Sequence, residues 1–515
     1  MSDKNKPGMG FEVNIRRPER RESATGADVP FCMAVLGDFS GSFDRVDTAN
    51  KPLAQRKLIS IDGDNFDEVL AGFKLLFSVS PASQSGNIIA ININELEDFH
   101  PDALYEKLEI FSKLRSIRLR LKNKSSFDTA ASEIMGWLVV GDPSDNSALS
   151  AKQKNQVKDI PQDSVLDSVL SATSQSASEI EKIISPGGID RLVRDIIAPY
   201  VEPATNPRQQ EMLDAVDTAT TELMRQILHH PHFQALESIW RSVYFLISRI
   251  ETGRTLKLYL LDVSKQELEV DLANDVTKSA LYKRFCEPAM NDMPWGLLVG
   301  NYIFEDNIND VLLLSQLGSI AQNAQAPFLA GAKETLAGCE SLAKYPDADD
   351  WQYSIKPGVD NAWQLLRQSP VADYIGLVLP RFLLRAPYGK KSRPIEAFSF
   401  EEITASKDVN HEAYLWGNAA FIKAEQLARA FTDKHWDMQP KDVNQTDNLP
   451  MCYYEDAGEV QLMPCAEIYL TEKGGRKLSQ RGLIALWSVK NMDAVRSSDF
   501  NALSADGKVL QGRWV

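Results

Sequence analysis

The stretch Phe31-Cys-Met-Ala-Val-Leu36 is an unbroken apolar run, and Gly37-Asp38 follows it directly. An apolar run of this length closed by a turn signal is typical of a buried strand. The segment from Ser60 to Asn65 supplies capping residues ahead of an apolar spacing of three and four, which predicts a helix from Phe66 to Phe73. Residues 87–93 then alternate between apolar and polar side chains, as a strand does. Strand, helix and strand in this order predict a small α/β unit.

Further elements extend this unit in both directions. Ahead of it, Phe11, Val13 and Ile15 alternate with polar residues and predict another strand. Behind it, His100-Pro101-Asp102 predicts the start of a helix, because proline is favoured at the first helical position. One face of that helix carries the apolar residues Leu104, Leu108, Phe111 and Leu114.

The second half of the chain predicts a larger mixed α/β domain. An apolar stripe from Phe233 to Ile250 predicts a helix, and Glu237 and Arg241 lie four residues apart on its flank, where they can form a weak ion pair. The next predicted elements are strands at 256–263 and 296–299, a helix at 310–324 and a strand at 327–330. Two last strands are predicted at 466–470 and 483–489, and the second is apolar on both faces, which favours the interior of a sheet.

The segment between these two halves lacks the residues that build a core. No aromatic residue lies between Trp137 and Tyr200, and polar residues crowd positions 142–182. One weak amphipathic patch leaves two interpretations open, a short docked helix or a solvated tether; it consists of Val165, Leu166, Val169 and Leu170. We therefore predict a multidomain α/β protein in four parts: a small unit at 1–140, a polar linker with short helices at 141–209, a core at 210–450 and C-terminal strands at 451–515.

Composition and charge exclude several classes of protein. The 515 residues are 43% hydrophobic and 25% charged, as in ordinary globular proteins, and the formal charge of −15 repels nucleic acid and anionic lipid. No apolar run approaches the roughly 18 residues that a membrane span needs. The five cysteines show no C-x-x-C spacing and fit reduced, packed thiols. We expect a cytoplasmic protein that binds no nucleic acid and does not insert into a membrane.

No motif in the sequence has the spacing that catalysis or cofactor binding requires. Residues 37–41 follow a strand but lack the Gly-Lys-Ser/Thr of a phosphate loop. His229, His230 and His232 form the densest metal-capable cluster, but Pro231 interrupts them where the next helix begins. A composite metal enzyme site near His229, His230 and Asp310 stays open as a distant alternative. The sequence favours a structural protein without catalytic residues, cofactor or metal.

Positive charge gathers around the apolar run 377–384, against an acidic background. The basic residues are Arg381, Arg385, Lys390, Lys391 and Arg393. Such a cluster predicts a docking face for an acidic protein surface, with a solvated loop as the alternative.

Several segments, taken in chain order, resemble the two subunits of the contractile sheath of the bacterial type VI secretion system. Residues 35–41, 61–70 and 96–102 resemble the small subunit, TssB/VipA. Further segments resemble the large subunit, TssC/VipB: 228–241, 294–296, 326–328, 464–470 and 482–491. The most specific of them is Pro380-Arg-Phe-Leu-Leu-Arg-Ala-Pro-Tyr-Gly389. In that family the two subunits are separate chains, and here they are fused.

The resemblance implies a function and a set of partners. Sheath subunits of this family form a heterodimer, and the dimers stack into a helical polymer around an Hcp tube that contraction drives outward. The implied partners are further copies of this chain, an Hcp-type tube, baseplate proteins and the unfoldase ClpV. The helix that ClpV recognises is expected near 164–170 or 190–197. An accessory or capping sheath-like protein of the same system is the alternative.

The resemblance also implies roles for individual residues. Sheath protomers share strands in a sheet between neighbours, and the donated strands are expected to be unpaired or disordered in a lone protomer, with pairing inside one domain as the alternative. These strands carry Phe11, Val13, Ile15, Leu483, Ala485, Trp487 and Val489. Packing or tube docking is expected of the signature residues Pro380, Arg381, Phe382, Arg385, Pro387, Tyr388, Trp240 and Arg241. Arg385→Glu is expected to impair tube docking or protomer packing and to leave the monomer folded.

Overall fold

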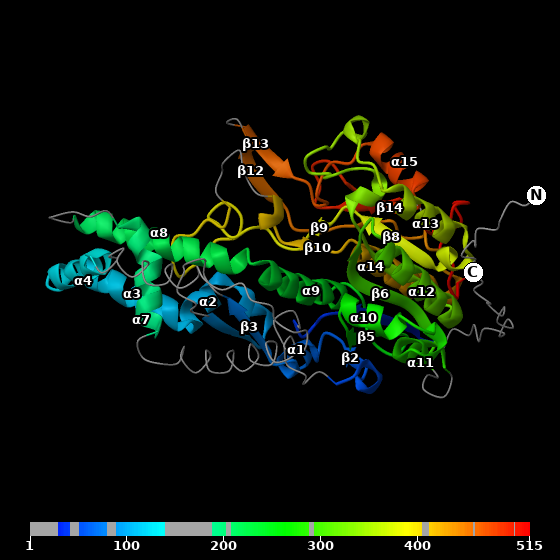
Figure 1. Ribbon diagram of the computed structural model, residues 1–515, viewed down its shortest axis with the longest axis horizontal. Coiled ribbons are helices and arrows are strands. Elements are labelled where there is room, and N and C mark those ends of the chain that lie inside the picture. The colour runs from blue at the N-terminus through cyan, green and yellow to red at the C-terminus, as the bar shows by residue number, and fades with distance from the viewer. Residues whose placement is uncertain are drawn as a thin grey trace, which may run out of the picture.

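The structure is a computed structural model, and it describes the greater part of the chain. The described residues are 29–41, 51–79, 89–139, 188–201, 208–287, 293–403, 411–456, 459–498 and 500–514. Among them, a large sheet lies between layers of helices, a helical arm extends to one side, and a hairpin of two strands projects above the sheet (Figure 1).

The strands run in chain order as follows: β1 Phe31–Gly37, β2 Ile59–Ile61, β3 Leu75–Val79, β4 Ile89–Ile93, β5 Leu256–Asp262, β6 Trp295–Phe304, β7 Phe328–Ala332, β8 Ile375–Leu379, β9 Phe382–Leu383, β10 Trp416–Gly417, β11 Gln445–Thr446, β12 Cys452–Asp456, β13 Glu459–Met463, β14 Leu483–Ser488 and β15 Val495–Ser497. The α-helices are α1 Phe66–Gly72, α2 Pro101–Lys107, α3 Glu109–Lys122, α4 Phe127–Val139, α7 Gly188–Ile197, α8 Gln209–Leu228, α9 Pro231–Ile247, α10 Lys265–Leu272, α11 Ala280–Cys286, α12 Ile308–Ala324, α13 Pro357–Gln368, α14 Ala420–Lys434 and α15 Glu472–Gln480.

Strand β1 lies inside a sheet that the rest of the chain builds. The order of the nine strands is β11-β15-β14-β8-β7-β6-β1-β5-β2. Strand β1 pairs in parallel with β5 from Phe31↔Leu256 to Gly37↔Asp262, and in parallel with β6 on its other edge. A strand from the first 40 residues is therefore hydrogen-bonded on both edges by strands more than 200 residues away.

The side chains of β1 contribute to the cores on both faces of the sheet. Phe31, Met33 and Val35 belong to the core that includes α9 and α14. Cys32, Ala34 and Leu36 belong to the core that includes α10 to α13 and α15. All six side chains have no exposed surface, as expected for a strand apolar on both faces in a parallel sheet. Gly37 ends the strand where a Cβ atom would lie 2.5 Å from the side chain of Ile239 in α9, so a larger residue would force that side chain to shift.

The rest of the N-terminal half packs against α8 and α9. The small sheet β3–β4 contributes Phe77, whose ring lies 5.3 Å from that of Phe233 in α9. Helix α3 packs on α7 and α8 to form the arm at the left of Figure 1. Arg118 and Asp217 form an ion pair between α3 and α8. One continuous core therefore runs from the arm to the large sheet.

Several predicted elements are confirmed with small shifts of their ends. They are the strands β1, β4, β5, β6, β7 and β14 and the helices α1, α9 and α12. The single helix predicted after Pro101 is wrong, because the backbone of Leu108 is extended, which ends α2 and begins α3. The strand predicted at 466–470 is also wrong, since only Ala466 forms an isolated bridge, to Phe382.

The outcome for the predicted donor strands is mixed. The prediction that 483–489 lies in the interior of a sheet is confirmed, because β14 pairs with β8 and with β15. The expectation that this strand is unpaired in a lone protomer is wrong, because both neighbours belong to the same chain. A role in contacts between protomers stays a prediction for Leu483, Ala485, Trp487 and Val489. Phe11, Val13 and Ile15 lie outside the described residues.

The predicted linker is described only at its carboxyl end. The patch at 165–170 lies outside the described residues. Helix α7 lies inside the predicted linker, and its apolar face is buried against the arm through Leu192, Val193, Ile196 and Ile197. Strands from both sides of residue 450 pair in the large sheet, where β14 lies beside β8. The four-part division of the chain stays a prediction.

The position of β1 predicts that a substitution there destabilises the C-terminal half. Leu36→Ala removes a fully buried side chain and should lower the free energy of unfolding by about 2–5 kcal/mol. Tryptophan fluorescence in a urea titration measures this, because of the nine tryptophans only Trp137 precedes residue 210. Leu76→Ala, at a half-exposed position of β3, is the control and should cost less than about 1 kcal/mol. An unchanged fluorescence midpoint in Leu36→Ala would contradict the placement of β1.

Candidate functional site

The signature segment leaves the carboxyl end of β8 and crosses the rim of the large sheet. Its residues Phe382 and Leu383 form β9, which pairs with β10, and both are buried. Arg381 and Arg385 lie four residues apart, and each one belongs to a separate cluster of carboxylates. These two clusters form the candidate site.

The first cluster surrounds Arg385 and is buried. Its guanidinium donates from Nε to Oε1 of Glu237 at 2.8 Å and from Nη1 to Oε2 of Glu402 at 2.7 Å. Arg241 also donates from Nε to Glu237, at 2.6 Å, and the backbone N–H of Tyr388 donates to Glu402 at 2.7 Å. Two guanidinium groups and two carboxylates thus balance in charge.

Burial and ion pairing act in opposite directions on these carboxylates. Burial alone would raise the pKa of Glu402, but the charge of Arg385 and the hydrogen bonds to the carboxylate lower it to about 2. Burial would raise the pKa of Glu237 as well, but the charges of Arg385 and Arg241 and their hydrogen bonds to the carboxylate lower it. Burial would lower the pKa of Arg385, and its two carboxylate partners raise it. The cluster is therefore held in its fully ionised form.

The burial of Arg385 contradicts the predicted docking role of this residue. Its side chain is 3% exposed and faces Glu237 and Glu402 inside the protein. An acidic surface of another protein cannot reach it, and Arg385→Glu would place three carboxylates together without the cation that balances them. The ion pair predicted for Glu237 and Arg241 is confirmed, with Nε of Arg241 2.6 Å from Oε1 of Glu237, but Glu237 is fully buried, so the pair lies inside the protein.

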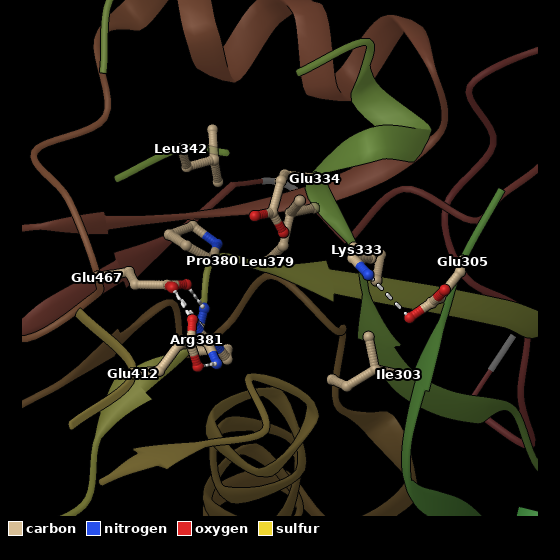
Figure 2. Close-up of a pocket in the computed structure, with 11 residues that line it drawn as sticks. Ile303, Glu305, Lys333, Glu334, Leu342, Leu379, Pro380, Arg381, Glu412 and Glu467 are labelled. Atoms are coloured by element: carbon tan, nitrogen blue, oxygen red, sulfur yellow. Dashed lines mark hydrogen bonds and ion pairs between the residues drawn. The ribbon is translucent and has the colours of Figure 1, made fainter. Parts of the chain in front are cut away.

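The second cluster surrounds Arg381 at the rim (Figure 2). Arg381 donates from Nε to Oε1 of Glu467 at 3.0 Å and from Nη1 to Oε2 of Glu412 at 2.9 Å. Nε2 of His411 lies 3.1 Å from Oε1 of Glu467. Burial would raise the pKa of Glu467, but Arg381 and His411 lower it to about 2. Arg381 is 31% exposed, so this cluster borders solvent, unlike the first.

Other signature residues connect the two halves of the chain. The indole of Trp240 in α9 donates to the backbone oxygen of Phe39 at 3.2 Å, and its ring meets those of Phe39, Phe66 and Phe73 edge-on. Tyr388 stands edge-on to His100 of the N-terminal half, 4.7 Å between ring centroids. Each aromatic pair adds about 0.5–1.5 kcal/mol beyond its buried area. Trp240 and Tyr388 are therefore placed where the halves pack.

The remaining predicted residues take separate positions. Pro380 lines the hollow beside Arg381, and Pro387 accepts a hydrogen bond from Ser392 through its carbonyl oxygen. Lys390 is exposed on the loop beyond the signature segment. Of the basic residues in the predicted docking face, the only exposed ones lie in this loop.

The residues of the predicted metal alternative do not converge on one site. Asp310 lies in the first turn of α12, where Asn307 is the cap, and pairs with Lys265. His229 faces Glu402 at 3.7 Å, and the side chain of His230 caps α9. Within the described ranges, no group of three or more His, Cys, Asp or Glu side chains is arranged to hold a metal ion. Likewise, no described helix has the length and apolarity to cross a bilayer.

Sequence reasoning missed Glu402 as a partner of Arg385. Glu402 lies in an ordinary polar stretch, and 17 positions separate it from Arg385. Sequence reasoning also missed Glu467 as a partner of Arg381, because the pattern at 466–470 predicted only a strand. An arginine flanked by apolar residues on both sides was the available signal for burial, since a buried arginine needs carboxylate partners.

Comparisons with known proteins match the chain in two regions. Residues 210–502 match the VipB family, described as EvpB/VC_A0108, tail sheath N-terminal domain. Residues 12–134 match the family described as type VI secretion system, VipA, VC_A0107 or Hcp2. The order and limits of the matches agree with the two halves that pack in the structure.

Two relatives come from Pseudomonas aeruginosa. The type VI secretion system sheath protein TssC1 is 32% identical over 295 residues, which cover 55% of this chain and 59% of that protein. The sheath protein TssB1 of the same system is 31% identical over 151 residues, which cover 28% of this chain and 83% of that protein. The chain thus spans less than two thirds of the first relative and most of the second.

Removal of Arg385 should destabilise the whole protein. Arg385→Ala leaves Glu237 and Glu402 buried with too few cations, a loss of about 3–5 kcal/mol in the free energy of unfolding. Lys390→Ala, on the exposed loop beside the signature segment, is the matched control and should change stability by less than about 0.5 kcal/mol. Urea denaturation of the two variants measures the difference. Equal midpoints would show that the Arg385 cluster does not stabilise the fold.

The rim cluster predicts a loss of stability in acid. The pKa of Glu467 is about 2 when folded, below the ordinary 4.5, so its stabilisation is complete above pH 4.5 and is lost as the pH falls toward 2. That shift corresponds to stabilisation on the order of 3 kcal/mol at pH 7. Glu467→Gln should therefore be less stable at neutral pH and flatter in its pH dependence, measured by urea denaturation from pH 7 to 3. If the free energy of unfolding fell with pH equally in variant and parent, the ionisation of Glu467 would be excluded as the cause of the acid instability.

Proposed function

The chain belongs to the VipB family of type VI secretion sheath proteins and carries a VipA-family region ahead of it, and from this premise we propose that it is a fused sheath protomer that polymerises around an Hcp-type tube. The observation that supports the proposal best is the position of β1 between β5 and β6. Both named relatives are sheath proteins, which supports a structural role rather than an enzymatic one.

Fusion has a direct consequence for assembly. Two separate chains must meet before a strand such as β1 can enter a sheet of the other chain. In one chain the same step is intramolecular, at an effective concentration of about millimolar for a short flexible linker. Fusion also fixes the ratio of the two halves at one to one. On this proposal, the protomer is complete as soon as the chain has folded.

Contacts between protomers are proposed to form by strand addition. The proposed donor is the alternating stretch Phe11 to Ile15, and the proposed acceptor is the hairpin β12–β13, which projects from the body in Figure 1. Each strand of the hairpin pairs with the other, and within the described residues its outer edges carry no further strand. Such edges bind added strands, and two-stranded ribbons are marginally stable alone. The exposed side chain of Tyr453 on β12 supports the same interpretation.

Contraction, baseplate proteins and ClpV are further parts of the proposed function. Contraction would draw on the packing energy of the extended polymer, and baseplate proteins would start its assembly. Recognition by ClpV near 190–197 would require α7 to leave the arm, because its apolar face is buried against α3 and α8. This burial argues against α7 as a freely accessible recognition helix.

Electron microscopy of the purified chain tests the proposed function. The parent protein should form tubes, alone or with an Hcp-type protein. Ile15→Pro removes a backbone donor from the proposed strand and should abolish tubes without changing the thermal unfolding of the protomer. Ser23→Pro, outside the proposed strand, is the matched control and should still form tubes. Discrete particles in every sample would support a cap instead of a sheath, and tubes of Ile15→Pro would exclude this strand as donor.

A further inference from the structure

Two neighbouring hollows meet at the rim cluster of Arg381. The first, of about 330 Å³, is lined by Glu305, Lys333 and Glu334 together with Arg381, Glu412 and Glu467. The second, of about 410 Å³, is lined by Glu467 and by residues at the base of the hairpin, including Gln461 and Met463 of β13. Glu467 lines both hollows, so they lie next to each other between the hairpin and the rim of the sheet. We call the two hollows together the acid groove.

The acid groove lies where parallel sheets commonly bind ligands. Glu305 follows β6, Lys333 and Glu334 follow β7, and Pro380 and Arg381 follow β8, so the first hollow is built at the carboxyl ends of three parallel strands. Backbone leaves the sheet there in loops, and side chains from several strands converge.

Carboxylates outnumber cations in the groove. The first hollow has the acids Glu305, Glu334, Glu412 and Glu467 and the cations Lys333 and Arg381. Lys333 is paired with Glu305 at 3.0 Å, and Arg381 is shared between Glu412 and Glu467. A cationic ligand is therefore the complementary one.

Among the described residues, Glu334 is the carboxylate of the first hollow that forms no ion pair. Figure 2 shows it at the same hollow as Pro380 and Arg381, with dashed lines at the Lys333 and Arg381 pairs and none at Glu334. Across the described residues, its side chain forms no ion pair and no hydrogen bond with another side chain. Burial raises the pKa of Glu334, and the charge of Glu467 adds to the increase, while its own backbone N–H and the charges of Arg381 and Lys333 offset it only in part. A guanidinium placed between Glu334 and Glu467 would relieve both effects and form paired N–H···O bonds with carboxylate oxygens.

The sequence supplies a matching cationic segment. Four arginines, Arg16, Arg17, Arg20 and Arg21, follow the proposed donor strand at once. A donor strand that runs from the tip of the hairpin toward its base would deliver this run to the near end of the acid groove, and the proposal takes this direction. Six extended residues span about 20 Å.

We propose that the acid groove binds the arginine run Arg16–Arg21 of a second copy of this chain, with a guanidinium at Glu334. This inference rests on the proposed strand exchange and adds to it an electrostatic anchor beyond the strand. Strand pairing is carried by backbone groups and is sequence-tolerant, whereas the anchor fixes the register of the added strand.

Cross-linking in the assembled full chain tests the proposal. A variant with all four arginines changed to lysine keeps the positive charge and makes the run reactive toward carboxylates in the presence of a carbodiimide. Assembly from an equal mixture of isotopically light and heavy chains shows whether a linked pair joins two copies. The expected result is mixed light–heavy peptides that link residues 16–21 to Glu334, Glu412 or Glu305. Links within one copy only, or links only to acids outside the groove, would overturn the proposal.

A charge-removing variant tests the anchor without any change in the arginine run. Glu334→Gln should raise the protein concentration needed for assembly by about tenfold, the effect of one lost charged hydrogen-bonded pair. Glu109→Gln, exposed on α3 in the arm, is the control and should leave that concentration unchanged. If tubes form but the cross-links are absent and Glu334→Gln assembles at the parent concentration, binding of the arginine run in the acid groove is overturned. The proposed sheath function is unaffected by that result. Failure of the parent chain to assemble would instead overturn the proposed function.

Discussion

The parallel pairing of β1 with β5 and β6 is the interaction on which the rest of the structure depends. It places a strand from residues 31–37 between strands that begin at 256 and 295, so the sheet cannot be complete without the N-terminal half. Both faces of β1 are buried, and its side chains take part in the cores on each side. The two family regions therefore make one folded body, and the family boundary in the sequence is not a boundary in space.

This constraint explains why conspicuous charges point inward. Where α9 and the signature segment meet, Arg385 and Arg241 neutralise the two buried carboxylates Glu237 and Glu402. Tyr388 of the same segment packs on His100 of the N-terminal half. Buried charges stabilise little on their own, but an unbalanced one is costly, so the cluster favours a single arrangement of these segments. Charge that borders solvent includes the Arg381 cluster at the rim of the sheet and the exposed Lys390 on the following loop.

The sequence predicted local structure better than it predicted partners. The run at 31–36 and the stripe of α9 were predictable because burial on both faces, or on one helical face, leaves a periodic pattern. That β1 enters a sheet more than 200 residues away leaves no local signal, and neither does the pairing of Arg385 with Glu402. Arg385 was predicted on the surface because charge usually lies there, whereas tertiary carboxylates hold it inside. Residues 466–470 were predicted as a strand because apolar residues alternate there as well, but in the structure only Ala466 forms a single bridge.

The most direct measurement is cleavage of the covalent connection between the halves. A specific protease site inserted between residues 150 and 160 would allow the folded chain to be cut after purification. The account predicts that the two fragments stay together in gel filtration without denaturant and unfold in one transition, because β1 remains hydrogen-bonded between β5 and β6. Separation of the fragments into two folded species under native conditions would contradict it.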